Sequence, residues 1–192
     1  VAVVEALINF DDRLSEYTYE GVPDIRVIVF LGYPVMAMMR LSTAASDGKA
    51  NLHQGAVGVG LDIATGTAIR GVQFDRTRHD HPDTGHELAS LHIPDWRTLL
   101  LLAAGCYEMT GLGYLGTDMV LDRDQGPMLL ELNARPGLAI QMANGEGLRR
   151  RLDLIEQQPP GASPEARVDF AQRHFARRSE LEAIADAAEA TA

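Results

Sequence analysis

The segment from Leu115 to Leu138 constrains the fold of this chain most, because it predicts a β-hairpin that gathers acidic residues. Two strand-like runs, Leu115–Leu121 and Pro127–Leu132, flank a tight turn at Asp122–Gly126. Short apolar runs separated by a turn that contains glycine are typical of an antiparallel pair. The side chains of such a pair alternate between two faces, so the sequence also predicts which residues meet.

One face of this hairpin is predicted to be rich in oxygen ligands. Asp118 should lie nearly opposite Glu131, and Asn133 follows two residues later on the same face. Two carboxylates and an amide oxygen are hard ligands that suit Mg²⁺ or Mn²⁺. Glu131 follows the apolar run Met128–Leu130, so we expect it to be buried, and a buried carboxylate needs a partner or a metal. The alternative is a solvated hairpin face without a metal.

A second hairpin is predicted upstream. Asp24–Phe30 alternates charged residues with Ile and Val, a Gly-Tyr-Pro turn follows, and Val35–Leu41 forms the partner strand. Arg26 and Arg40 lie on these two strands. An unpaired arginine there would be costly, so each should face an anion or a carboxylate. For Arg26 the alternative is a purely structural pair with Asp24 or another local acid.

The remaining pattern predicts an α+β fold with a mixed, mainly antiparallel sheet backed by helices. Further strands are expected at Val57–Ile63 and Ala68–Phe74, and helices at Trp96–Met109 and Leu138–Leu152. Ser42–Asn51 is small and polar and indicates a mobile loop. After residue 157 the composition changes: residues 158–192 are interpreted as a proline-rich linker followed by a helix, and residues 1–157 as one lobe.

Composition excludes several classes of function. The chain has 17 Lys and Arg against 27 Asp and Glu, a net charge of −10 that opposes general nucleic-acid binding. The single cysteine, Cys106, is expected to be buried and forms no internal disulfide. No apolar run approaches the roughly 20 residues of a membrane helix. We therefore expect a cytoplasmic protein with neither nucleic acid nor membrane as partner.

Histidines cluster in the polar segment Arg76–Glu87, with one more just after it. Together with a nearby aspartate, they could bind zinc. Their spacing fits no zinc-ligand pattern, and a surface loop is the alternative. A zinc hydrolase is therefore disfavoured. The histidines are His79, His81, His86 and His92.

Four motifs, taken in order, resemble the ATP-grasp superfamily, in particular its α-L-glutamate-ligase-related branch and its sugar-transfer-associated group. They are Asp24–Arg26, Met38–Arg40, Asn51–Gly55 and Glu131–Gly137. The resemblance runs from about Val3 to about Asn144 and implies the C-terminal catalytic lobe of that fold. It implies an ATP-dependent ligase that joins a carboxylate to an amine, of small molecules or peptides, through an acyl phosphate. ATP and Mg²⁺ would be the cofactors, and a homo-oligomer is possible.

The resemblance also assigns roles to individual residues. Arg40 and Asn51 would stabilise the transferring phosphate and the acyl phosphate, with Arg26 beside them. Two Mg²⁺ ions would bind the acid–Glu-x-Asn set of the later hairpin. Arg135 either grips the acceptor's carboxylate or is simply exposed. The metal ligands would be Asp118, Glu131 and Asn133, and the nucleotide contacts Glu5, Leu7, Asp12 and Leu130.

Two features depart from the family pattern. The first is Arg135, since the family usually has a small residue or Ser at that position. The second concerns the lysines. In the family, two lysines hold the nucleotide phosphates, and they lie on strands upstream of the hinge strand that contacts adenine. In this chain Lys49 is the only lysine. We therefore expect the N-terminal domain and the lysine-bearing lobe to precede Val1, and the chain alone to have little activity. The alternative is a non-catalytic ATP- or metal-binding assembly module.

Overall fold

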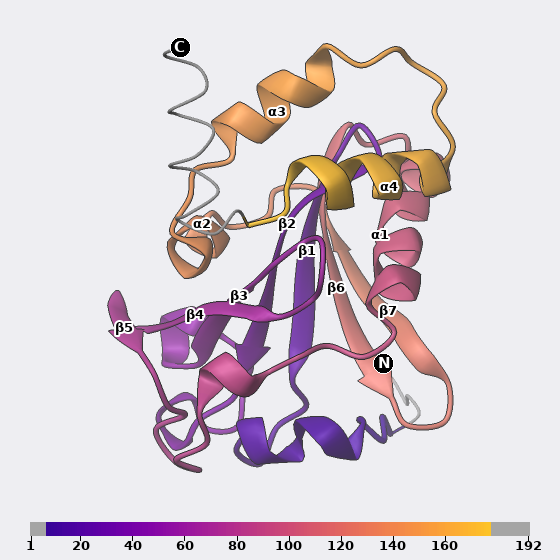
Figure 1. Cartoon of the computed structure of the whole chain (residues 1–192). Helices are drawn as coiled ribbons and strands as arrows, with labels where there is room; N and C mark the ends of the chain where they lie inside the picture. The colour runs from indigo at the N-terminus through magenta and orange to yellow at the C-terminus, as the bar shows by residue number, and fades with distance from the viewer. Residues whose placement is uncertain (1–6, 178–192) are drawn as a thin grey trace, which may run out of the picture.

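A computed structural model describes residues 7–177, which form a seven-stranded sheet with helices packed on it (Figure 1). The strand order is β5-β4-β3-β2-β1-β6-β7, and every neighbouring pair is antiparallel. The α+β class is confirmed, and the sheet contains no parallel pair among these seven strands. The strands are β1 (Asp24–Phe30), β2 (Tyr33–Leu41), β3 (Val57–Leu61), β4 (Ala68–Gln73), β5 (Arg76–Arg78), β6 (Tyr114–Asp122) and β7 (Gly126–Asn133).

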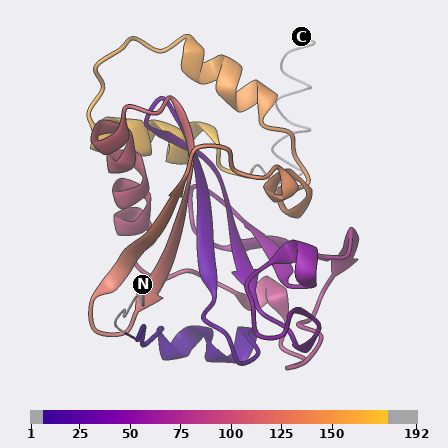
Figure 2. The ribbon, with the colours of Figure 1, turned by 180° about the vertical axis from the view of Figure 1, so that it is seen from behind.

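The helices lie mainly at one end of the sheet, and α1 runs alongside β6 and β7 (Figures 1 and 2). Helix α1 packs on β1, β2, β6, β7 and α4, while α2 packs on β2, β3 and β4. The helices are α1 (Trp96–Thr110), α2 (Ala139–Asn144), α3 (Arg149–Glu156) and α4 (Pro164–His174). Short 3₁₀ helices are η1 (Asp12–Tyr17), η2 (Ala44–Ser46), η3 (Leu52–Gln54) and η4 (Leu88–Ser90).

Both predicted hairpins are confirmed. Their turns and the alternation of apolar and polar residues in their strands are local features of the sequence. β1 has the predicted bounds, β2 begins two residues earlier than predicted, and β6 and β7 are each longer by one residue at both ends. Cys106 is buried in α1, as expected. Within residues 7–177, no helix is both long and apolar enough to cross a membrane.

Three details differ from the prediction. The helix expected over Leu138–Leu152 is two helices, because Gly145 adopts φ +66° and closes α2 with hydrogen bonds to Gln141 and Met142. The polar segment after β4 contains the short strand β5. The expected loop Ser42–Asn51 is hydrogen-bonded, with Thr43 Oγ1 donating to Gly55 O at 2.8 Å.

The segment after residue 157 packs on the same body as the sheet. The Phe170 ring of α4 meets Tyr33 of β2 edge-to-face at 5.4 Å. Arg167 is buried and pairs with Glu108 of α1. The part of the predicted C-terminal helix beyond residue 177 lies outside the described residues.

Three strand pairs contain a bulge that shifts the register. The extra residues are Val35 in β2, Ile69 in β4 and Leu130 in β7. A bulge leaves one residue out of the regular pairing and bends its strand. These three positions recur at the two sites described below.

Gly60 of β3 lets the backbone of α2 approach the sheet closely. A Cβ atom at Gly60 would lie 2.3 Å from the carbonyl oxygen of Ala143, whereas one at Gly105 in α1 would meet nothing within 4 Å. The backbone oxygen cannot move aside as a flexible side chain can. The approach of α2 to the sheet therefore requires glycine at position 60.

We predict opposite effects for two glycine-to-alanine changes. Gly60→Ala should lower the free energy of unfolding by about 2 kcal/mol or more, because it overpacks a backbone contact. Gly105→Ala should raise it by about 0.5–1 kcal/mol, because alanine is the better helix former and has room there. Urea unfolding followed by circular dichroism measures both. Similar values for the two variants would contradict the close α2 contact.

Candidate active site

Two aspartates and two arginines form a continuous charged network across three adjacent strands. The register places Asp24 of β1 opposite Arg40 of β2, and Arg26 of β1 opposite Asp118 of β6. Arg26 donates to Asp118 through Nε (2.7 Å) and Nη2 (2.5 Å). Arg40 donates in the same two-pronged way to Asp24, both at 2.5 Å. Arg40 Nη2 also lies 3.0 Å from Asp118 Oδ2, which links the two pairs.

The network is buried and electrically balanced. Its four side chains are only 7–14% exposed, and two positive charges meet two negative ones. A single buried charge would carry a large desolvation cost, whereas planar guanidinium–carboxylate pairs satisfy donors and acceptors together. The expectation that both arginines face an anion or carboxylate is confirmed. Arg26 pairs with Asp118 rather than with Asp24.

The protonation of the network follows from this burial. Burial raises the pKa of Asp24 to about 6, with a smaller rise from the nearby Asp118 carboxylate, while Arg40 opposes the rise. For Arg40, burial favours the neutral form, but the contacts with Asp24 and Asp118 outweigh it and leave the pKa raised. Arg40 is therefore a fixed positive charge near the end of β2.

The predicted pairing of the two acids is confirmed. Asp118 lies opposite Glu131, and Asn133 Nδ2 donates to Glu131 Oε1 at 3.3 Å, so these side chains share a face. The predicted burial of Glu131 is wrong. β7 is an edge strand of the described sheet, and Glu131 is exposed beside the bulge residue Leu130, which is 48% exposed. The argument for a metal therefore rests on the donor set and not on burial.

The donor set fits a hard divalent cation. Asp118 Oδ1 accepts one hydrogen bond, from Arg26, and so keeps a lone pair that could ligate a metal. Glu131 reaches solvent and offers a second carboxylate, and the side-chain oxygen of Asn133 is a third donor. Within residues 7–177 there is no group of three or more His, Cys, Asp or Glu that could hold a metal ion. The three donors therefore carry only two negative charges, those of Asp118 and Glu131. Arg26 and Arg40 already compensate the charge of Asp118.

The loop that follows Arg40 borders the same face. Arg40 is paired with Gly58 of β3, and a Cβ at Gly58 would lie 2.8 Å from Leu52 of η3. Asn51 begins η3, where its side-chain oxygen accepts a hydrogen bond from His53 N at 3.0 Å. Asn51 itself is exposed. The loop thus reaches the Arg40 end of the sheet, and Asn51 also caps a helix there.

The predicted nucleotide contacts are only partly brought together. Asn9 N donates to Asp122 Oδ2 at 3.1 Å, so the chain just after Leu7 runs beside the β6–β7 turn. Leu7 is 87% exposed, and Asp12 pairs with Arg123 of that turn. Glu5 lies outside the described residues. Arg135 is exposed and has no ion pair within the described part of the chain.

The histidine-rich segment has a structural role at its centre. His81 is buried, its Nε2 lies 3.0 Å from Ser42 O, and its Nδ1 accepts from the backbone N–H groups of Asp83 and Thr84. Burial lowers the pKa of His81. Asp83 also accepts from Ala44 N at 2.9 Å. These contacts attach the segment to the loop after β2. Among the described residues, no group of histidines and acids that could bind zinc is present.

Asp24 is the site residue that the sequence analysis missed. The sequence pattern indicated Asp24 only as part of a motif and as an alternative ion-pair partner of Arg26. Its signal was the register of the first hairpin, which places Asp24 directly opposite Arg40.

Comparison with known proteins gives one family match. A family model described as sugar-transfer associated ATP-grasp matches residues 1–157. A search of curated proteins found no significant match.

We predict that the two opposed acids differ sharply in their structural role. Asp118→Asn should lower the free energy of unfolding by about 3 kcal/mol, because it leaves two buried guanidinium groups undercompensated. Glu131→Gln should change it by less than about 0.5 kcal/mol, because that side chain is exposed. Urea unfolding of both variants provides the comparison. Equal losses would mean that the network does not support the fold.

Proposed function

We propose that this chain, which belongs to the sugar-transfer associated ATP-grasp family, acts in an ATP-dependent ligase that joins a carboxylate to an amine through an acyl phosphate. Members of ATP-grasp families are typically ATP-dependent ligases that use Mg²⁺. The observation that carries the proposal is the shared face of β2, β1, β6 and β7. There β1 lies between β2, which carries Arg40, and the β6–β7 pair, which carries Asp118 and Glu131.

The proposed reaction has two steps. In the first, an oxygen of the substrate carboxylate attacks the γ-phosphorus of ATP, and the bond to the ADP oxygen breaks. In the second, an amine attacks the acyl carbon, phosphate leaves, and the amine loses a proton to give the amide. Phosphoryl transfer calls mainly for positioning and charge neutralisation, and both are available on this face.

Arg40 is the proposed catalytic cation. Asp24 holds its guanidinium by two hydrogen bonds, so its position is fixed before substrate arrives. A preorganised donor needs no reorganisation when charge moves onto the transferring oxygens. Asn51, on the loop that borders the same end of the sheet, would contribute a neutral polar contact. Asp24 is thus a positioning residue that acts through Arg40.

Asp118, Glu131 and Asn133 would hold Mg²⁺. When bound, the ion would supply positive charge that offsets the negative charge of the ATP phosphates. Arg26 keeps Asp118 in one orientation through its two-pronged contact and so fixes the more buried carboxylate of the set. Exposed Glu131 remains free to adjust to the ligand.

The function is tested with the intact protein, ATP, Mg²⁺, a panel of carboxylates including L-glutamate, and hydroxylamine as the amine. An acyl phosphate reacts with hydroxylamine to give a hydroxamate, which is detected as its ferric complex. Carboxylate-dependent ADP and hydroxamate formation would support the ligase. Mg²⁺-dependent ATP binding in calorimetry without either product would instead favour the non-catalytic module.

We predict that Arg40→Lys lowers the rate of product formation about a hundredfold or more, with a smaller change in apparent ATP affinity. A lysine ammonium cannot reproduce the planar fork, and loss of one such donor costs about 3–4 kcal/mol in comparable oxyanion sites. Arg26→Lys is the matched control and should cost less, because Arg26 acts through Asp118. The measurement is steady-state phosphate release. Nearly full activity of Arg40→Lys together with loss of activity in Arg26→Lys would reverse the two roles.

A further inference from the structure

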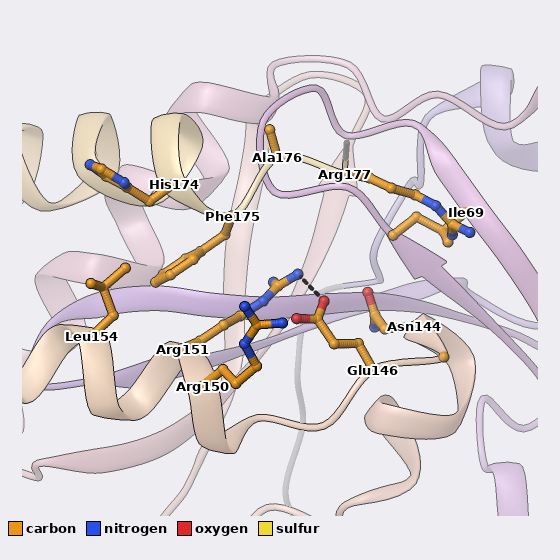
Figure 3. Close-up of a pocket in the computed structure, with 11 residues that line it drawn as sticks. Ile69, Asn144, Glu146, Arg150, Arg151, Leu154, His174, Phe175, Ala176 and Arg177 are labelled. Carbon is orange, nitrogen blue, oxygen red and sulfur yellow. Dashed lines mark hydrogen bonds and ion pairs between the residues drawn. The ribbon is translucent and has the colours of Figure 1, made fainter. Parts of the chain in front are cut away.

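A second concave site lies where the ends of α2 and α4 meet α3 (Figure 3). It is a pocket of about 600 Å³ whose lining includes Ile69, the bulge residue of β4. Its floor is tied to the first half of β2, because Asn144 donates to Ala37 O and Arg151 to Val35 O. Val35 is the extra residue of the β1–β2 bulge. Along β2, Val35 and Ala37 lie about 16 Å and about 10 Å from Arg40, and no residue of the charged network lines the pocket.

The pocket contains a buried hydrogen-bond acceptor that has no partner in the described part of the chain. Asn144 is 7% exposed, and its Nδ2 donates to both Ala37 O and Ile140 O at 2.9 Å. Both amide hydrogens are therefore used, and the reverse orientation would place the amide oxygen against these two backbone carbonyl oxygens. Asn144 Oδ1 has no hydrogen-bond partner among residues 7–177, and Asn144 is one of the pocket-lining residues in Figure 3. A buried carbonyl of this kind favours a ligand that carries an O–H or N–H group.

The charge of the lining favours an anion. Arg150 and Arg177 line the pocket and have no ion pair within the described part of the chain. Arg151 is buried against the Phe175 ring and pairs with Glu146 at 2.7 Å, so the one carboxylate among the described lining residues is already neutralised. The lining therefore carries positive charge on a chain whose net charge is −10. A free cation or an amine would find no uncompensated carboxylate among the lining residues that the structure describes.

We propose that this pocket binds a small hydroxylated oxyanion, whose acid group Arg150 and Arg177 hold and whose hydroxyl donates to Asn144 Oδ1. A phosphate ester of a polyol and a polyol carboxylic acid share this chemistry. A neutral polyol lacks the group that the arginines recognise. A zwitterion would place its ammonium against two unpaired guanidinium groups.

Calorimetry on the full chain tests the proposal with four probes. Glucose 6-phosphate and gluconate carry both features, whereas glucose and inorganic phosphate each carry one. At least one of the first two should bind with a millimolar or lower dissociation constant and at least tenfold more tightly than glucose or phosphate. Binding of only one of them identifies the acid as phosphate or carboxylate.

The variants test the residues. Arg150→Gln and Arg177→Gln should each weaken binding of the better probe about tenfold or more, because a hydrogen bond to a charged group is lost. Arg149→Gln is the matched control: it lies on the same helix, pairs with Asp153 and does not line the pocket. It should change binding less than about twofold, as should Glu131→Gln in the candidate active site. Thermal unfolding confirms that each variant is folded.

Three results would overturn the proposal. One is the absence of saturable binding by both charged probes up to about 10 mM. Another is an equal loss of binding in Arg149→Gln, which would indicate general surface charge. The third is loss of binding in Glu131→Gln, which would place the probe in the candidate active site. None of these results bears on the hydroxamate assay, so the two proposals fail separately.

Discussion

The charged network of Asp24, Arg26, Arg40 and Asp118 fixes how the central strands are aligned. Because side chains alternate along a strand, a shift of β1 by one residue would turn Asp24 and Arg26 to the opposite face and leave their partners unpaired. An apolar contact tolerates such a shift more easily, since one aliphatic neighbour can replace another. Two-pronged guanidinium–carboxylate pairs do not, because both distance and plane must match. The network therefore specifies register as well as contributing to stability.

The same network limits the proposed chemistry. Asp118 serves two arginines and would also serve a cation, so the binding of metal and phosphate would redistribute charge that already holds the sheet together. Arg40 can attract phosphate only in competition with Asp24 and Asp118. In such an active site, contacts with the bound metal and phosphate would replace contacts within the network, and the total charge of the site would change little.

The sequence predicts the features that a local pattern encodes. It does not predict features, such as side-chain exposure, that depend on the position of a strand in the sheet. The alternation in Asp24–Phe30 and the turn at Asp122–Gly126 were sufficient to predict two hairpins and the Asp118–Glu131 pair. The exposure of Glu131 could not be predicted, because an apolar run does not reveal that β7 lies at an edge. The pocket formed by Asn144, Arg151 and Arg177 depends on the bulges in β2 and β4 and on the docking of α4. These are long-range features that a local sequence pattern does not encode.

Gly60 has a consequence for how this chain can vary. The buried side of α2, which includes Ile140, Ala143 and Asn144, meets the sheet closely at Gly60. The side chains of Leu138 and Met142 do not support that contact, because they are 58% and 45% exposed. Saturation mutagenesis would then separate an intolerant glycine in β3 and the buried positions of α2 from the permissive, exposed positions of this region. The surface chemistry of α2 can diversify while the scaffold beneath it stays the same.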